Sequence, residues 1–156
     1  MGQQMSRQQT DRLRELVQEF VRKFGLLVTK ETPCGQPISL SYAHALMVLL
    51  ERDQAPATSQ TDLGLALGID KSNVTRLCSR MEAAGHISQA RAPEDGRSRL
   101  VQLTATGRRL AQRIDEASRE RFGRIVAAVS PDQRRGVLES LAVLNMAVGS
   151  LGQEQP

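Results

Sequence analysis

The residues best suited to chemistry are hydrogen-bonding side chains at the start of a helix predicted from Lys71. Ser72, Asn73 and Thr75 are short donors and acceptors, and Arg76 carries a fork of donors that suits guanine or phosphate. Residues of these types on the first turns are typical of a helix that reads base edges in a major groove. The amides at such a helix start also favour nearby phosphates. The pattern therefore predicts recognition of double-stranded DNA.

A second group of basic residues lies in the charged segment that follows this helix. Residues 87–91 and 97–103 read as strands, and the pair Asp95-Gly96 between them is typical of a hairpin turn. An arginine at such a tip fits a narrow minor groove, where negative potential concentrates. The residues that we assign to DNA contact are Lys71, Ser72, Asn73, Thr75, Arg76, Arg80, Arg91, Asp95, Arg97 and Arg99.

The sequence contains few residues that could support catalysis or bind a metal ion. It holds two His and two Cys, and its acidic residues show no arrangement suited to acid–base catalysis. We therefore expect no enzyme, no cofactor and no metal site. Cys78 falls on the apolar side of its helix and reads as a core residue. For Cys34, three alternatives stay open: an oxidant sensor, a metal ligand and an unreactive loop thiol.

Composition limits the class of partner. The chain has 156 residues, which suits one domain, and its net charge of +4 permits a nucleic-acid partner without requiring one. Aromatic residues are only 3% of the chain, too few for the stacking platforms of proteins that read single strands. Neither a secretory signal nor an apolar run of membrane-spanning length is present, so we expect a cytoplasmic protein without a membrane partner.

The order of apolar and breaking residues predicts the elements that position these groups. Residues 11–29 carry one apolar stripe at helical spacing, and the loop 32–37 separates them from a second helix. Either Ser39 or Ser41 caps that second helix. Its buried face is predicted to hold Ala43, Leu46, Met47 and Leu50.

Capping signals mark the next two helices. Ser59 and Asp62 have the spacing of a capping box and open a short helix that runs through Leu67. Asp70 caps the following helix, and Gly85 is its natural stop. The apolar face of this helix is formed by Val74, Leu77, Cys78 and Met81.

Two long helices complete the prediction. Thr104 or Thr106 starts one that reaches about residue 129, and Ser130 caps another over 131–150. Together with 11–29, these helices are too apolar for a 156-residue monomer to cover easily. We therefore expect a homodimer with recognition helices roughly 34 Å apart, which suits a pseudo-palindromic duplex.

These motifs resemble the MarR family of transcription regulators over essentially the whole chain. The resemblance rests on residues 59–87, on R-x3-D-x-R at 91–97 and on V-x-LT-x-x-G at 101–107. Its most specific element is Asp95-Gly96-Arg97. The chain departs from the family pattern at Gly64, where Ala is usual, and at His86, where an apolar residue is common.

The resemblance implies a mainly α, winged helix-turn-helix fold with a two-stranded β-wing and flanking dimerisation helices. Residues 1–156 would then be one subunit, with 39–104 as the DNA-binding part and 11–29 and 106–151 as the dimerisation helices. In the family the wing Asp orients the wing Arg, which enters the minor groove, so these roles would fall to Asp95 and Arg97.

The implied function is a sequence-specific, ligand-responsive repressor, although activation stays open because a sequence does not fix the sign of regulation. Relatives often bind aromatic acids, and the residues that would line such a site by their place in the chain are Phe20, Phe24, Tyr42 and His44. The alternative is a redox- or small-molecule-sensing dimer in which DNA binding is secondary.

Overall fold

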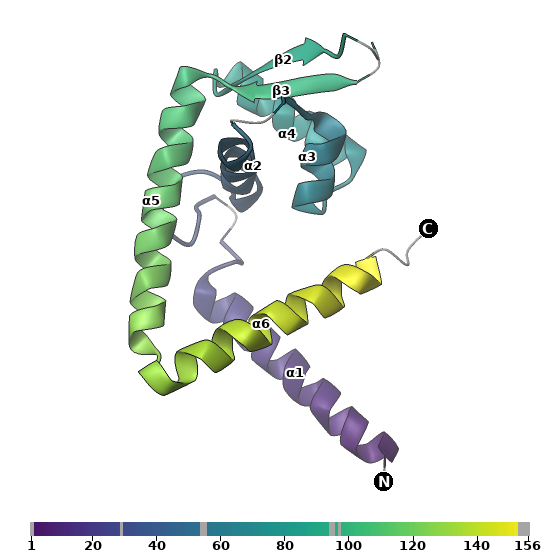
Figure 1. The fold of residues 1–156 in the computed structure, drawn as a ribbon, viewed down its shortest axis with the longest axis vertical. Helices are drawn as coiled ribbons and strands as arrows, with labels where there is room; N and C mark the ends of the chain where they lie inside the picture. Colours follow the sequence, from purple (N-terminus) through teal and green to yellow (C-terminus); the bar gives the residue numbers. More distant parts are fainter. Residues whose placement is uncertain (1, 29, 54–55, 94–95, 97, 153–156) are drawn as a thin grey trace. The chain divides into compact units, whose positions relative to one another are not determined.

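The computed structural model describes residues 2–28, 30–53, 56–93, 96 and 98–152, with side chains from residue 7 onward. The chain divides into two compact units, Met1–Ala117 and Ser118–Pro156, and α5 contributes to both. The elements in chain order are α1 (Gly2–Phe24), α2 (Leu40–Glu51), β1 (Thr58–Ser59), α3 (Gln60–Leu67), α4 (Lys71–Ala83), β2 (Ile87–Arg91), β3 (Arg99–Leu103), α5 (Ala105–Ala128) and α6 (Pro131–Gly152). The predicted mainly helical fold is confirmed (Figure 1).

The sheet is larger than the predicted two-stranded wing. It has three antiparallel strands in the order β1-β3-β2, because Thr58 and Ser59 pair with Val101 and Leu100. A two-residue strand leaves no alternating pattern in the sequence, which is why β1 was not predicted. The strand β2 has its predicted bounds, whereas β3 begins at Arg99, two residues later than predicted.

The first unit has one hydrophobic core, which lies among α2, α3, α4, the sheet and the start of α5. The predicted apolar face of α4 is confirmed: Val74, Leu77, Cys78 and Met81 are all buried. The predicted face of α2 was partly wrong. Met47 and Leu50 are half-buried, and the residues of α2 that are buried are Tyr42, Ala43, Ala45, Leu46 and Leu49.

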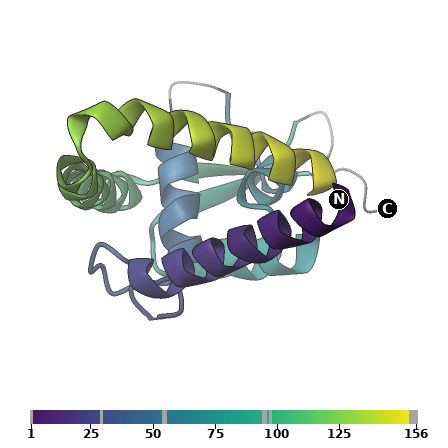
Figure 2. The ribbon, with the colours of Figure 1, turned by 90° about the horizontal axis from the view of Figure 1, so that it is seen from below.

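The helix α1 begins and ends earlier than the predicted 11–29 (Figures 1 and 2). Gly25 has a φ of 85°, and the amide of Leu26 donates to the carbonyl of Val21 at 3.1 Å. This left-handed glycine closes the helix at Phe24, because a residue with a side chain disfavours that conformation. The apolar spacing continues to Leu27, but Leu27 lies beyond the helix and is exposed.

In the second unit, the end of α5 and the start of α6 are joined by a tight connection. The hydroxyl of Ser130 donates to Oε1 of Gln133 at 2.6 Å, so the predicted helix start is confirmed. Arg134 Nε donates to the carbonyls of Val126 and Val129 at 3.1 and 3.0 Å and so satisfies the end of α5. The helix α6 runs without interruption, and none of its described residues is buried.

Candidate nucleic-acid interface

The helix α4 is held in the first unit by caps at both ends. The carboxylate of Asp70 accepts from the backbone amide of Asn73 at 2.8 Å, and this bond lowers the pKa of Asp70 below its usual value. At the other end, Gly85 adopts a φ of 74°, and the amide of His86 donates to the carbonyl of Met81. Both predicted caps are confirmed, and they fix where the exposed face of α4 begins and ends.

A chain of hydrogen bonds runs along the first turns of α4. The side-chain amide of Asn73 donates to Asp70 at 2.6 Å, and Arg76 donates to Oδ1 of Asn73 at 3.1 Å. The two predicted base-reading side chains, Asn73 and Arg76, are therefore linked by hydrogen bonds to the helix cap. Thr75 is different, because its hydroxyl donates to the carbonyl of Lys71 and keeps only acceptor capacity for a partner.

The other predicted residues of α4 lie on the same exposed side. Lys71, Ser72, Asn73, Thr75, Arg76 and Arg80 are all exposed, while the opposite face of the helix is in the core. A groove of 530 Å³ lies between the start of this face and the hairpin. Its walls include Lys71 and Thr75 of α4, and Ser98 and Arg99 of the hairpin.

The hairpin places two of the predicted arginines opposite each other. Arg91 and Arg99 are paired across the β2–β3 ladder, and both are exposed. Like charges in directly opposed positions repel, so this pair is less costly beside an anionic partner. Asp95 and Arg97 lie outside the described residues.

Polar contacts that the sequence did not indicate fasten the hairpin to α4. The carboxylate of Glu82 accepts from the backbone amide of Gln89 at 3.1 Å and from its side-chain amide at 2.9 Å. Gln60, at the start of α3, donates to Oε1 of Gln89. Glu82 lies seven positions and Gln60 lies 29 positions from Gln89, and none of the three belongs to a motif, so only the fold reveals that they orient β2 against α3 and α4.

The four predicted effector-lining residues fall in different surroundings. The rings of Phe20 and Phe24 stack on α1 with centroids 5.1 Å apart. Tyr42 is buried in α2 and hydrogen-bonds to His86, whereas His44 is exposed. Among the residues that the structure describes, no group of His, Cys, Asp and Glu is arranged to hold a metal ion. Cys34 is half-buried, with Sγ 3.0 Å from the hydroxyl of Thr32.

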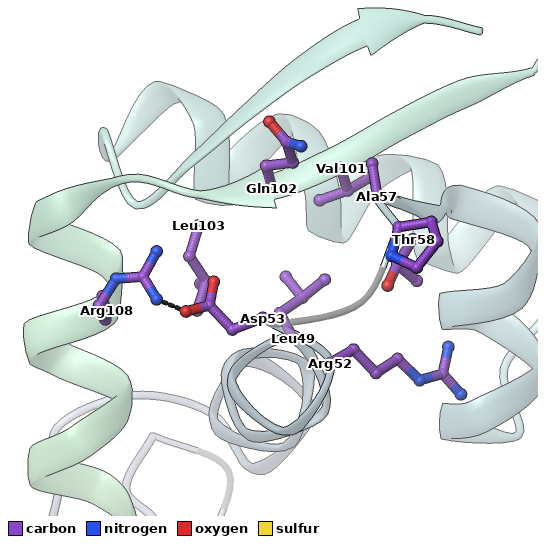
Figure 3. Close-up of a pocket in the computed structure, with 10 residues that line it drawn as sticks. Leu49, Arg52, Asp53, Ala57, Thr58, Val101, Gln102, Leu103 and Arg108 are labelled. Carbon is purple, nitrogen blue, oxygen red and sulfur yellow. Dashed lines mark ion pairs between the residues drawn. The ribbon is translucent and has the colours of Figure 1, made fainter.

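A cavity of 210 Å³ lies among the end of α2, β1, β3 and the start of α5, and Figure 3 shows the residues that line it. Leu49 and Leu103 form part of its wall, and Arg108 of α5 makes an ion pair with Asp53. This cavity contains none of the predicted effector residues. The ion pair between Arg108 and Asp53 ties the start of α5 to the end of α2.

No helix within the described ranges combines the length and the apolar character needed to cross a membrane.

Comparisons with known proteins agree with this geometry. Residues 37–98 match the family model described as the MarR family. The chain is 33% identical over 117 residues to YdgJ, an uncharacterised HTH-type transcriptional regulator of Bacillus subtilis, covering 73% of this chain and 68% of YdgJ.

Two solved structures share the fold. The PcaV transcriptional regulator of Streptomyces coelicolor, in complex with its natural ligand, has a TM-score of 0.63 at 25% identity, over 87% of this chain and 90% of PcaV. MepR of S. aureus, in a complex with DNA, has a TM-score of 0.65 at 17% identity, over 95% of this chain and 98% of MepR. The family and these relatives are transcription regulators rather than enzymes, and this chain, with its capped and exposed helix α4 beside a basic hairpin, belongs to the MarR family of DNA-binding winged helix-turn-helix regulators.

Proposed function

We propose that this chain is a homodimeric regulator that binds a pseudo-palindromic operator in the cytoplasm and releases it when a small molecule binds. The observation that carries this proposal is the hydrogen-bonded chain Asp70–Asn73–Arg76 on the exposed start of α4. An ordered donor and acceptor set loses little side-chain freedom when it meets base edges, so the cost of binding is low. Release of the operator by an effector would make the protein a repressor.

The wing completes the DNA contact in this proposal. Arg91 and Arg99 would face phosphates, which would relieve their mutual repulsion across the ladder. Arg97 would enter the minor groove with Asp95 as its orienting partner. The groove between α4 and the hairpin would let Lys71 and Arg99 contact neighbouring parts of one backbone.

A second copy of the chain is the occupant that we propose for the exposed apolar faces. Leu13, Leu16 and Phe20 of α1 are between 45% and 52% exposed, and Phe122 near the end of α5 is 50% exposed. On α6 the exposed fraction reaches 69% at Met146, and none of the described residues of this helix is buried. None of the described residues of the second unit is buried, so these helices would need a partner surface to become stable.

The effector class follows from analogy and from side-chain type. PcaV was solved with a natural ligand, and this chain is 25% identical to it. Phe20, Phe24 and the exposed His44 would offer aromatic and hydrogen-bonding surface to an aromatic acid, whereas the fourth predicted residue, Tyr42, is buried and bonded to His86. We assign no sensing role to Cys34, because the nearest basic residue in sequence, Lys30, is opposed by Glu31, and a reactive thiol needs net positive surroundings.

The test uses a duplex that the wild-type chain selects from a random-sequence library. Fluorescence anisotropy then measures affinity for this duplex and for random duplex over a range of salt. We expect Asn73→Ala and Arg76→Ala to reduce the discrimination between the two duplexes, with Arg97→Ala losing about 1–3 kcal/mol of binding free energy. Asp95→Ala should give a milder loss than Arg97→Ala.

The matched control is Arg113→Ala, which removes one positive charge from the exposed side of α5. It should leave discrimination unchanged. Failure of the wild-type chain to enrich any duplex would refute the proposed function. Equal losses for Arg76→Ala and Arg113→Ala would instead limit the role of α4 to general electrostatic attraction.

A further inference from the structure

The recognition helix and the core helix α2 are linked by a contact that neither the DNA interface nor the hydrophobic core accounts for. Tyr42 of α2 is only 6% exposed, yet its hydroxyl lies 2.6 Å from Nδ1 of His86. On the ring of the same tyrosine lies the guanidinium of Arg80, whose central carbon is 5.9 Å from the ring centroid. Arg80 is on the exposed face of α4.

The backbone of His86 makes two hydrogen bonds and one close packing contact. Its amide donates to the carbonyl of Met81, and its own carbonyl accepts from the amide of Thr104 at 3.1 Å. The carbonyl also lies against Gly107, where a Cβ atom would stand only 1.8 Å from it. The backbone of His86 is therefore held by α4, by the segment before α5 and by the first turn of α5.

The imidazole of His86 in turn fixes the ring of Tyr42. The two rings meet edge to face, with an interplanar angle of 87° and centroids 5.8 Å apart. A tyrosine in a packed helix keeps its position when its hydroxyl is also bonded, because both ends of the side chain are then held. The ring face that Arg80 contacts is therefore a fixed surface.

We propose that Tyr42 is a positioning residue for DNA binding, whose fixed ring holds the Arg80 guanidinium toward the phosphate backbone. A long arginine side chain on an exposed helix face otherwise samples many rotamers, and ordering it on contact would weaken binding. A cation over an aromatic face keeps its remaining donors available. This inference rests on the proposed DNA-binding function, because it assigns Arg80 a phosphate contact.

The first test needs no DNA. The chain has one tyrosine and no tryptophan, so its ultraviolet phenolate absorbance reports on Tyr42 alone. Burial raises the pKa of Tyr42, and the charge of Arg80 opposes that rise. Arg80→Gln should therefore shift the phenol titration to higher pH, whereas Arg80→Lys, which keeps the charge, should stay closer to wild type. An unchanged titration in Arg80→Gln would overturn the contact itself.

The second test is a double-mutant cycle on the duplex selected by the wild-type chain. Arg80→Gln and Tyr42→Leu should each weaken binding about two- to fivefold and lower the salt dependence by about one phosphate contact. The double variant should bind no more weakly than Arg80→Gln, because Tyr42 acts only through Arg80. If the affinity losses of the two single variants multiply in the double variant, the proposal is overturned, because Tyr42 would then affect DNA binding through the stability of the fold and not through Arg80.

Tyr42→Phe keeps the measurement interpretable if Tyr42→Leu does not fold. It retains the ring, loses only the bond to His86, and should give a smaller loss than Arg80→Gln. Binding of Tyr42→Phe weaker than that of Arg80→Gln would contradict the proposal. If the wild-type chain binds no duplex, the proposed function fails and the role of Arg80 fails with it, while the titration still decides whether Tyr42 and Arg80 are in contact.

Discussion

Gly107→Ala is the substitution whose cost the structure determines most directly. Gly107 is buried in the first turn of α5, and an added Cβ would lie 1.8 Å from the carbonyl oxygen of His86 and 2.7 Å from its carbonyl carbon. Real Cβ atoms essentially never approach within 3.0 Å of such an atom, so α5 and His86 must separate by more than 1 Å. Both contacts are with backbone, so no side-chain rotation relieves the clash.

The separation also breaks hydrogen bonds that join the same elements. The amide of Thr104 donates to the carbonyl of His86 at 3.1 Å, and the hydroxyl of Thr104 donates to the carbonyl of Gly85 at 2.6 Å. Overpacking of a fixed site costs about 1–3 kcal/mol, and each lost hydrogen bond adds about 1 kcal/mol. We expect Gly107→Ala to lower the free energy of unfolding by roughly 3–5 kcal/mol, a large part of a typical domain's stability.

Urea denaturation followed by circular dichroism measures this change. The matched control is Gly123→Ala in the same helix, where an added Cβ meets no atom within 4 Å. That variant should be stabilised by about 0.5–1 kcal/mol, because alanine favours a helix interior over glycine. A Gly107→Ala protein within 0.5 kcal/mol of wild type would refute the close approach of α5 to His86.

Three further outcomes are expected. Burial, with a smaller contribution from Glu82, raises the pKa of Cys78 from 9.0 to about 11. The contribution of the protonated Cys78 thiol to the free energy of unfolding is therefore complete below pH 9 and is lost as pH rises through 11. The free energy of unfolding of the wild-type protein, measured by denaturation, should then be about 2 kcal/mol lower near pH 10.5 than near pH 8. This decrease should be absent in Cys78→Ala. Hydrogen bonds to Asn73 lower the pKa of Asp70, so its contribution is present above about pH 4 and is lost at more acid pH; Asp70→Ala should lower Tm at neutral pH while Asp70→Asn, which keeps a cap, should not. Leu141→Asp should separate the proposed dimer in sedimentation at micromolar concentration, since a carboxylate in an apolar interface costs several kcal/mol, whereas Ala142→Asp, about 100° round the helix, should remain associated.

The recognition helix could be predicted because its signals are local. Asp70 precedes its first turn, Gly85 follows its last, and the apolar residues recur every three or four positions between them. Each signal acts within one or two turns of the chain, and tertiary packing reinforces it here. The same holds for Ser59, whose hydroxyl accepts from the amide of Asp62 at 3.0 Å at the start of α3.

Features that depend on residues far apart could not be predicted in the same way. The bond between Tyr42 and His86 spans 44 positions, and Tyr42 was assigned to an effector site only by its place in the chain. His86 is a departure from the family pattern, but no local signal in the sequence pairs it with Tyr42 of α2. The end of α1 was predicted wrongly for a different reason. The apolar spacing continues beyond Gly25, although the left-handed conformation of this glycine ends the helix.

Three residues of the segment 101–107 have structural roles at the junction of β3 and α5. Val101 is buried between β1 and β2, and the hydroxyl of Thr104 accepts from the amide of Gly107 at 3.0 Å, which starts α5. That hydroxyl also donates to Gly85, so the residue that opens α5 holds the residue that ends α4. Gly107 then lets the carbonyl of His86 approach closely. Each position is set by backbone geometry at the junction of the recognition helix, the wing and α5, so changes here should disturb DNA binding through the relative placement of these three elements.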